Sequence, residues 1–310
     1  MSTPLVTIRC LVYNHEPYLR QCLDGFVMQK TNFLFEAIVH DDASTDRSAE
    51  IIREYAEKYP DIIKPIFETE NQYSKHDGSI GRIMNEHTRG KYVAICEGDD
   101  YWIDEFKLQK QVDILRHNNI GLCYTRARIY NQREKKFQSV ISFPYENFQS
   151  LLIRNPIATL TVMYKKELYD SYIKEIKLDN KKWLMGDYPL WLWIASQKDI
   201  FFLDDITAVY RYLDQSASHL RGNIQKQLAF NKSIKDIQLY YASKFNMDNY
   251  LTCVINDEYY RRVAYDYMID MERIYSIDAL KKIVRKSFFE KVKIIIFHFP
   301  FLFKLYVRNL

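Results

Sequence analysis

Three acidic side chains follow one apolar run of this chain directly. Residues 92–95 (Tyr-Val-Ala-Ile) have the composition of a buried strand, and Glu97, Asp99 and Asp100 come after it in the segment CEGDDYW. Carboxylates this close together repel one another and are costly to desolvate. A divalent cation relieves that repulsion, and hard oxygen ligands suit Mg²⁺ or Mn²⁺. The segment indicates either a metal site for a diphosphate-containing substrate or an acidic turn that caps the next helix.

Two earlier apolar runs also end in polar side chains. The first is followed by Tyr13 and Asn14, and the second runs into Asp41 and Asp42 in the segment HDDASTD. Adjacent parallel strands bring such ends together in one crevice, where open α/β sheets bind their ligands. A tyrosine ring can stack on a nucleobase, and a carboxylate can accept a hydrogen bond from a base N–H. The competing interpretation is a pair of turns, with residues 44–46 capping the following helix.

Strand and helix signals alternate over the first part of the chain. The elements they predict would position the polar residues described above. The hydrophobic periodicity predicts strands at 5–13, 35–39, 62–67 and 92–96 and helices at 16–29, 51–59, 80–88 and 108–115. Gly90 is expected to end the third helix in a left-handed C-cap. Such alternation indicates a mostly parallel, twisted sheet with right-handed crossovers.

After about residue 120 the pattern changes. It predicts strands at 121–129, 137–143, 160–164, 201–203 and 208–212, a buried helix at 188–195, and helices from residue 223 onward. We therefore expect a catalytic domain at 1–220, with halves at about 1–118 and 119–220, and a helical C-terminal extension at 221–310.

Composition restricts the class of protein. Hydrophobic residues make up 47% of the 310 residues, which is ample for a sizeable core. The five cysteines have no CxxC spacing, which argues against a disulfide framework or a zinc site and for a reducing compartment. No signal peptide or clean membrane-spanning stretch is recognisable, so a cytoplasmic location is expected.

The net charge of +4 is unevenly distributed. Between Lys281 and Leu310 there are eight Lys and Arg residues and one acid, Glu290, so this segment carries +7 and the remainder −3. Its last part, FFEKVKIIIFHFPFLFKLYVRNL, is also strongly apolar. We expect it to lie in a membrane interface with its basic side chains snorkelling, and not to bind nucleic acid. The alternative is a helix packed on the domain or on a second subunit.

Several common active-site motifs are missing from the sequence. The eight glycines form neither GxGxxG nor GxxxxGK[ST], and the chain has no HExxH and no GxSxG. Nicotinamide-type dinucleotide folds, P-loop enzymes, zinc peptidases and α/β-hydrolases are therefore disfavoured.

Three segments in order, LVTIRCLVYNHEPYLRQCLDG, HDDASTD and RGKYVAICEGDDYW, resemble the inverting glycosyltransferases of family 2, of the bacterial surface-polysaccharide type. The resemblance covers roughly residues 4–215. It implies a GT-A-like three-layer α/β/α fold, a nucleotide-sugar donor, UDP as the nucleotide, and Mn²⁺ or Mg²⁺ as cofactor. The residues it assigns to the nucleotide are Tyr13, Asn14, Asp41, Asp42, Arg82, Asp99 and Arg211, and those it assigns to the metal are Asp99 and Asp100.

Two further segments resemble the family more loosely. MGDYPLW resembles its Glu-Asp motif, which makes Asp187 the general base, with Gly186 in place of the usual Glu. YRYLDQSAS resembles a basic segment near the donor phosphates, in which Arg211 matches an arginine and Leu213 replaces a frequent His. The competing interpretation of Asp187 is a helix N-cap ahead of Pro189.

The expected function is transfer of a sugar, with inversion, to a glycan or lipid-linked acceptor in cell-surface polysaccharide biosynthesis. Two alternatives remain open. A sugar-1-phosphate nucleotidyltransferase also joins an α/β sheet to acidic metal ligands, although it normally opens with a glycine-rich basic loop that residues 5–20 lack. A non-catalytic GT-A-like binding protein would not need to keep Asp99, Asp100 and Asp187.

Overall fold

The computed structural model describes residues 3–75, 77–176, 182–213 and 223–308. The chain divides into two compact units. The sheet unit comprises Met1–Tyr145, Pro156–Lys181 and Trp193–Tyr212, and the helical unit comprises Glu146–Asn155, Lys182–Leu192 and Leu213–Leu310.

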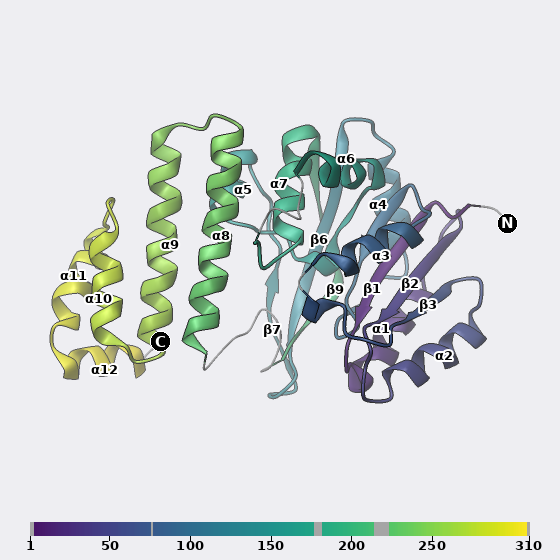
Figure 1. Ribbon diagram of the computed structural model, residues 1–310, viewed down its shortest axis with the longest axis horizontal. Helices are drawn as coiled ribbons and strands as arrows, with labels where there is room; N and C mark the ends of the chain where they lie inside the picture. The colour runs from purple at the N-terminus through teal and green to yellow at the C-terminus, as the bar shows by residue number, and fades with distance from the viewer. Residues whose placement is uncertain (1–2, 76, 177–181, 214–222, 309–310) are drawn as a thin grey trace. The chain divides into compact units, whose positions relative to one another are not determined.

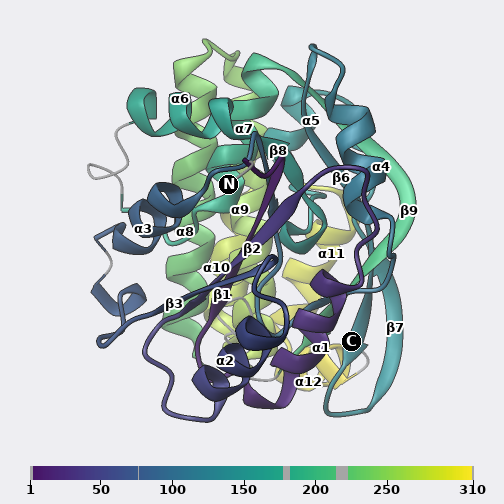
Figure 2. The same ribbon diagram turned by 90° about the vertical axis from the view of Figure 1, so that its right-hand side faces the viewer.

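The described strands of the sheet unit form one mixed sheet in the order β3-β2-β1-β4-β8-β6-β9-β5. Strand β7 lies outside this order and pairs antiparallel with β6. Figure 2 shows β1, β2 and β3 beside one another. The pairs among β3, β2, β1 and β4 are parallel, whereas β8 runs antiparallel to both β4 and β6. The strand bounds are β1 Val6–Val12, β2 Phe35–Asp41, β3 Ile63–Phe67, β4 Tyr92–Ile95, β5 Tyr101–Trp102, β6 Ile120–Asn131, β7 Lys136–Ile141, β8 Met163–Lys165 and β9 Asp199–Tyr212.

Strand β1 is buried on both faces. Val6, Ile8 and Cys10 form an apolar face, and on the other face Thr7 and Arg9 are buried with hydrogen bonds to the side chains of Glu36 and Thr88. In β1 (VTIRCLV) every residue except Leu11 is buried, as is typical of a parallel strand covered on both sides. The helices of this unit are α1 Glu16–Val27, α2 Ser48–Lys58, α3 Ser79–His87, α4 Lys107–Leu115 and α6 Lys166–Ile176, with 3-10 turns η1 Tyr73–Lys75 and η2 Thr159–Thr161. Helices α1 and α2 lie side by side (Figure 1). The alternation of strands and helices predicted for the first 118 residues is thus confirmed.

The glycine that was expected to cap α3 has a different role. Helix α3 ends at His87, and its C-cap residue Thr88 has an extended backbone. A Cβ atom on Gly90 would lie 2.4 Å from the backbone nitrogen of Thr7 and 2.7 Å from the carbonyl carbon of Val6. Gly90 is required because β1 passes too close for any side chain, and the prediction of a left-handed C-cap was wrong.

Three other local expectations are corrected. The strands expected at 201–203 and 208–212 form one long strand, β9, whose parallel pairing with β6 continues across register shifts. The strand expected at 160–164 begins as the turn η2 and becomes extended only at β8. Helices α5 and α6 were not predicted.

The described part of the helical unit is formed by α5 Phe148–Ile153, α8 Ile224–Lys244, α9 Asn249–Ile269, α10 Arg273–Lys282, α11 Phe288–Phe297 and α12 Pro300–Arg308. Helices α8 and α9 pack along each other (Figure 1). Helix α7, Asp187–Gln197, begins in the residues of this unit, and its Trp191 is fully buried, which confirms the buried helix predicted there. Among the described residues, no helix has both the length and the hydropathy needed to cross a membrane.

Candidate active site

The carboxyl ends of β1, β2 and β4 meet at one edge of the sheet. The register pairs Val12 of β1 with Asp41 of β2. The backbone N–H of Asp42 donates to the carbonyl oxygen of Val12 at 2.9 Å, and that of Gly98 donates to the carbonyl oxygen of Leu11 at 2.9 Å. The three polar segments singled out from the sequence therefore lie next to one another, at the edge where open α/β sheets bind their ligands.

The loop after β4 gathers three carboxylates. Glu97, Asp99 and Asp100 each offer an oxygen, and these oxygens lie within 4.8 Å of one another. Asp100 is only 3% exposed, and burial, followed by the negative charge of Asp99, raises its pKa well above the usual range. A set of carboxylate oxygens fits Mg²⁺ or Mn²⁺, whose charge would offset this repulsion. The arrangement is therefore suited to hold a divalent cation.

Arg211, near the end of β9, secures this loop. Its backbone N–H donates to Oδ1 of Asp100 at 2.7 Å, and its Nε donates to the carbonyl oxygen of Asp99 at 2.7 Å. Its other two nitrogens donate to the amide oxygens of Gln132 and Gln21 at 2.9 and 2.8 Å. The guanidinium also lies over the rings of Tyr18 and Tyr101. Arg211, which the resemblance assigns to the donor, thus lies against the loop after β4, and the sequence gave no signal for the two glutamines that orient it.

The loop after β2 is tied to the end of β1. The side-chain oxygen of Asn14 accepts from the backbone N–H of Thr45 at 2.8 Å, and the backbone N–H of Asn14 donates to Oγ of Ser44 at 2.9 Å. Asn14 and Ala43 both have positive φ angles, 56° and 59°. Such left-handed conformations are costly outside glycine and persist where neighbouring contacts hold them. Asn14 thus shapes this edge.

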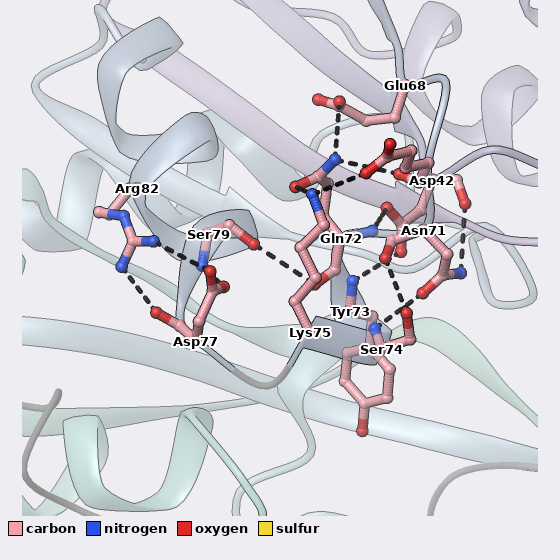
Figure 3. Close-up of polar contacts among 11 residues, drawn as sticks. Asp42, Glu68, Asn71, Gln72, Tyr73, Ser74, Lys75, Asp77, Ser79 and Arg82 are labelled. Atoms are coloured by element: carbon pink, nitrogen blue, oxygen red, sulfur yellow. Dashed lines mark hydrogen bonds and ion pairs between the residues drawn. The ribbon is translucent and has the colours of Figure 1, made fainter.

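The two aspartates of this loop differ in their hydrogen bonds. Oδ1 and Oδ2 of Asp42 accept from the backbone N–H groups of Gln72 and Tyr73 at 2.6 and 3.0 Å (Figure 3). Asp41 is equally buried, but its Oδ1 has no hydrogen-bond partner among the described residues. Burial raises the pKa of Asp41. Asp42 therefore secures the turn η1, whereas Asp41 keeps an acceptor atom for a ligand.

Arg82 and Tyr13 lie on the surface around this edge. Tyr13 follows β1 directly and is 47% exposed, which leaves its ring accessible for stacking. Arg82 belongs to α3, and its Nη1 donates to the carbonyl oxygen of Asp77 at 2.7 Å. Figure 3 shows Arg82 on the same stretch of chain as the residues that Asp42 binds.

His15 was not singled out from the sequence. Its buried Nδ1 has no partner in the described part of the chain, and a Cβ atom on Gly98 would lie 2.7 Å from it. Burial lowers the pKa of His15, and the charges of Asp99, Asp46 and Asp41 oppose that shift. The ring therefore lies close to both acidic loops. Its position directly after Asn14 was the signal that could have identified it.

Asp187 is the first residue of α7 and belongs to the helical unit. Its Oδ1 accepts from the backbone N–H of Tyr188 at 2.7 Å. The next residues are firmly held, because the Tyr188 hydroxyl donates to the carbonyl oxygen of Leu151 at 2.9 Å and the Tyr241 hydroxyl to that of Pro189 at 2.8 Å. A Cβ atom on Gly186 would meet nothing within 4 Å, so this departure from the Glu-Asp motif leaves open space.

The structure describes only the first part of the segment YRYLDQSAS. Tyr210, Arg211 and Tyr212 end β9, and Leu213 is half-buried. Residues 214–218 lie outside the described residues.

The model of the family described as "Glycosyl transferase family 2" matches residues 10–172, more than half of the chain. This chain belongs to glycosyltransferase family 2. The match includes the end of β1, all of β2 and β4, and both acidic loops, so the resemblance stated from three segments is confirmed.

Individual proteins are also similar to this chain in sequence. An uncharacterized protein of Mycobacterium tuberculosis is 35% identical over 216 residues, which are 66% of this chain and 58% of that protein. The chain thus matches little more than half the length of this relative. The Escherichia coli protein WfgD, named UDP-Glc:alpha-D-GlcNAc-diphosphoundecaprenol beta-1,3-glucosyltransferase, is 26% identical over 222 residues, 70% of this chain and 81% of that protein.

Solved structures agree on the fold. The mannosyltransferase PcManGT from Pyrobaculum calidifontis, in complex with GDP-Man and Mn²⁺, has a TM-score of 0.56 and 15% sequence identity, covering 99% of this chain and 88% of that one. At this identity the likeness shows the fold alone. The GT-A-like α/β fold with helices after the sheet is thereby confirmed.

Proposed function

We propose that this glycosyltransferase moves a sugar from a UDP-sugar to a hydroxyl of a glycan or lipid-linked acceptor, with inversion at the anomeric carbon. The observation that carries the proposal is the cluster of Glu97, Asp99 and Asp100 at the same sheet edge as Asp41, whose Oδ1 has no hydrogen-bond partner among the described residues. A family 2 enzyme must bind the diphosphate and the nucleobase of its donor. This edge of the sheet offers the chemistry for both.

We assign binding of the nucleobase to the loops after β1 and β2. The exposed ring of Tyr13 stacks on the nucleobase, and Oδ1 of Asp41 accepts a hydrogen bond from it. Uracil presents an imide N–H to such an acceptor, which favours UDP. Asn14 and Asp42 shape this part of the site through their hydrogen bonds to the neighbouring backbone. The name of WfgD, which gives UDP-Glc as the donor, supports the same nucleotide.

The diphosphate is assigned to the loop after β4. Asp99 and Asp100 are the proposed metal ligands, and Glu97 is near enough to assist them. A divalent cation bound there, Mn²⁺ or Mg²⁺, would neutralise the charge that develops on the leaving diphosphate. The Mn²⁺ in the PcManGT complex supports this cofactor. Arg211 keeps the loop in place, and Arg82 supplies a further positive charge for the donor phosphates.

The chemical step is assigned to Asp187 as general base. Its carboxylate takes the proton of the acceptor hydroxyl while that oxygen attacks the anomeric carbon. The bond between the anomeric carbon and the phosphate oxygen breaks on the opposite face, and the nucleoside diphosphate leaves with the bonding electrons. One displacement of this kind inverts the configuration and needs no covalent intermediate.

The acceptor and its place are inferred from the relatives and from charge. The name of WfgD contains a diphosphoundecaprenol acceptor, which supports a lipid-linked glycan in surface-polysaccharide synthesis. We place the enzyme in the cytoplasm, peripherally at the inner face of the membrane, with residues 1–220 as the catalytic domain and 221–310 as its helical extension.

The test is a panel of nucleotide sugars offered with Mn²⁺. Thermal stabilisation identifies the donor, and the products of donor turnover identify the reaction. We expect the strongest stabilisation from a UDP-sugar, release of UDP, and a product whose anomeric configuration is opposite to that of the donor by NMR. Release of pyrophosphate, retention of configuration, or no response to any nucleotide sugar would contradict the proposal.

A further inference from the structure

Helices α11 and α12 have one face buried in the helical unit. Phe297 and Phe303 are 1% and 2% exposed, and their rings meet edge to face with 5.0 Å between centroids. They belong to a small core that includes Leu280 and Ile283. The two helices are therefore folded parts of this unit and not a loose end.

Polar contacts fix the approach to α11. The carboxylate of Asp257 on α9 accepts the backbone N–H groups of Val284 and Arg285 at 2.7 and 2.9 Å. Glu290 accepts from Arg261 at 2.6 Å and completes a capping box with Ser287 at the start of α11. Hydrogen bonds to the backbone before α11 and contacts of the Glu290 side chain thereby fix the orientation of this helix.

The outer face of the same two helices is apolar and exposed. Phe288, Val292 and Ile295 on α11, and Phe299 two residues beyond its end, are spaced i, i+4, i+7 and i+11 and so share one stripe. The large side chains of this face and their exposed fractions are Phe288 75%, Phe289 74%, Ile295 64%, Phe299 57%, Phe301 75% and Leu305 50%. Exposed large apolar side chains gathered on two consecutive helices in this way mark an interaction site.

The exposed charges of the segment that carries this face, residues 281–308, have one sign. The basic residues are Lys281, Lys282, Arg285, Lys286, Lys291, Lys293, Lys304 and Arg308. The one acid between residues 281 and 308 is Glu290, which is 9% exposed and paired with Arg261. Within this described segment, no exposed carboxylate balances the basic side chains. The occupant of the face must therefore be both apolar and anionic.

A second copy of the chain fits that requirement poorly. A two-fold interface brings identical patches together, which would place the basic groups of both copies against one another. A bilayer with anionic headgroups fits well, since the aromatic rings can enter the acyl boundary while the Lys and Arg side chains reach the phosphates. We propose that the outer face of α11 and α12 docks the protein onto an anionic lipid bilayer. This inference does not depend on the proposed sugar transfer.

The test is co-sedimentation of the full chain with vesicles of phosphatidylcholine alone or mixed in equal parts with phosphatidylglycerol. One variant carries Phe288→Ser, Phe289→Ser and Phe301→Ser, and a second carries Lys291→Glu and Lys304→Glu. All five side chains are exposed, so thermal unfolding should be unchanged. Leu34→Ser, at an exposed apolar residue (57% exposed) of the sheet unit, is the control.

We expect the wild type and Leu34→Ser to sediment with the anionic vesicles, and salt to weaken this binding without abolishing it. The phenylalanine variant should bind the anionic vesicles at least about tenfold more weakly than the wild type. Each charge reversal should lower the affinity for these vesicles at least about fivefold. Wild-type protein that stays in the supernatant at low salt would overturn the proposal. So would a phenylalanine variant that sediments like the wild type, or a wild-type dimer that this variant converts to a monomer. UDP binding, measured in parallel, tests the proposed function separately.

Discussion

The loops after β2 and β4 both place two consecutive aspartates at the carboxyl end of a buried strand, yet they surround them differently. In the first loop, both oxygens of Asp42 accept backbone N–H groups. In the second, three carboxylates approach one another, and the backbone N–H of Arg211 is the donor to Oδ1 of Asp100.

This difference shows how the same dipeptide acquires two kinds of chemistry. A carboxylate that accepts backbone N–H groups is stabilised as an anion without any cation. Carboxylates that face one another in a buried place need a positive charge between them. We therefore assign the loop after β2 to the neutral N–H of a base and the loop after β4 to a metal-bound diphosphate.

The largest effect is expected from a carboxylate outside both loops. Asp187→Asn keeps the shape of the side chain but removes the proton acceptor, so transfer should fall roughly 10²–10⁴-fold. Binding of UDP with Mn²⁺, measured by calorimetry, should stay normal because Asp187 belongs to neither loop. The control is Asp278→Asn, an exposed carboxylate of the same unit. Near-normal transfer by Asp187→Asn would remove the general-base assignment.

The metal dependence of UDP binding should separate the two loops. Asp100→Asn retains an oxygen for the N–H of Arg211 but loses the charge, so Mn²⁺-dependent binding of UDP should weaken by about 2–5 kcal/mol. Asp42→Asn is the matched variant in the other loop, and its response to EDTA should equal that of the wild type. If both variants keep the full Mn²⁺ effect, the cation is held elsewhere.

Base selectivity should depend on the first loop alone. Asp41→Asn can donate to the ring nitrogen of cytosine, and it should lose about 1.5–3 kcal/mol of UDP binding. The preference for UDP over CDP should therefore shrink while the Mn²⁺ dependence persists. An unchanged ratio of UDP to CDP affinity in competition calorimetry would show that Asp41 does not touch the base.

The smallest effect concerns stability. Asp42→Asn weakens the hydrogen bonds that hold the turn at Gln72 and Tyr73, and it should lower the free energy of unfolding by about 1 kcal/mol. Urea denaturation of this variant and of Asp100→Asn compares the two loops. We expect Asp100→Asn to be as stable as the wild type or more stable, since it relieves repulsion. The opposite order would contradict the electrostatic description of both loops.

Much of this comparison was accessible from the sequence. The apolar runs before Tyr13, Asp41 and Glu97 predicted three parallel strands, and their order placed the polar ends at one edge. The partners of each carboxylate were not accessible, because they come from distant segments. Nothing in HDDASTD shows that the backbone at residues 72–73 will satisfy Asp42, or that Oδ1 of Asp41 will have no hydrogen-bond partner among the described residues.

The same limit explains the other errors. Gly90 resembled a helix cap because the spacing after α3 was suitable, whereas its real constraint is the approach of β1, more than 80 residues earlier in the chain. The partner of Arg211 at Gln21 is separated from it by 190 residues. Close backbone approach and long-range side-chain pairs arise only from the packed fold.

We predict that the loop after β4 holds the cation. Anomalous diffraction at the manganese edge, from crystals grown with Mn²⁺ and UDP, tests it most directly. We predict one anomalous peak about 2.1 Å from carboxylate oxygens of Asp99 and Asp100, a distance suited to a small hard cation, with the UDP diphosphate next to it. UDP bound at this edge with no peak between these carboxylates, or a peak at other residues, would contradict the account.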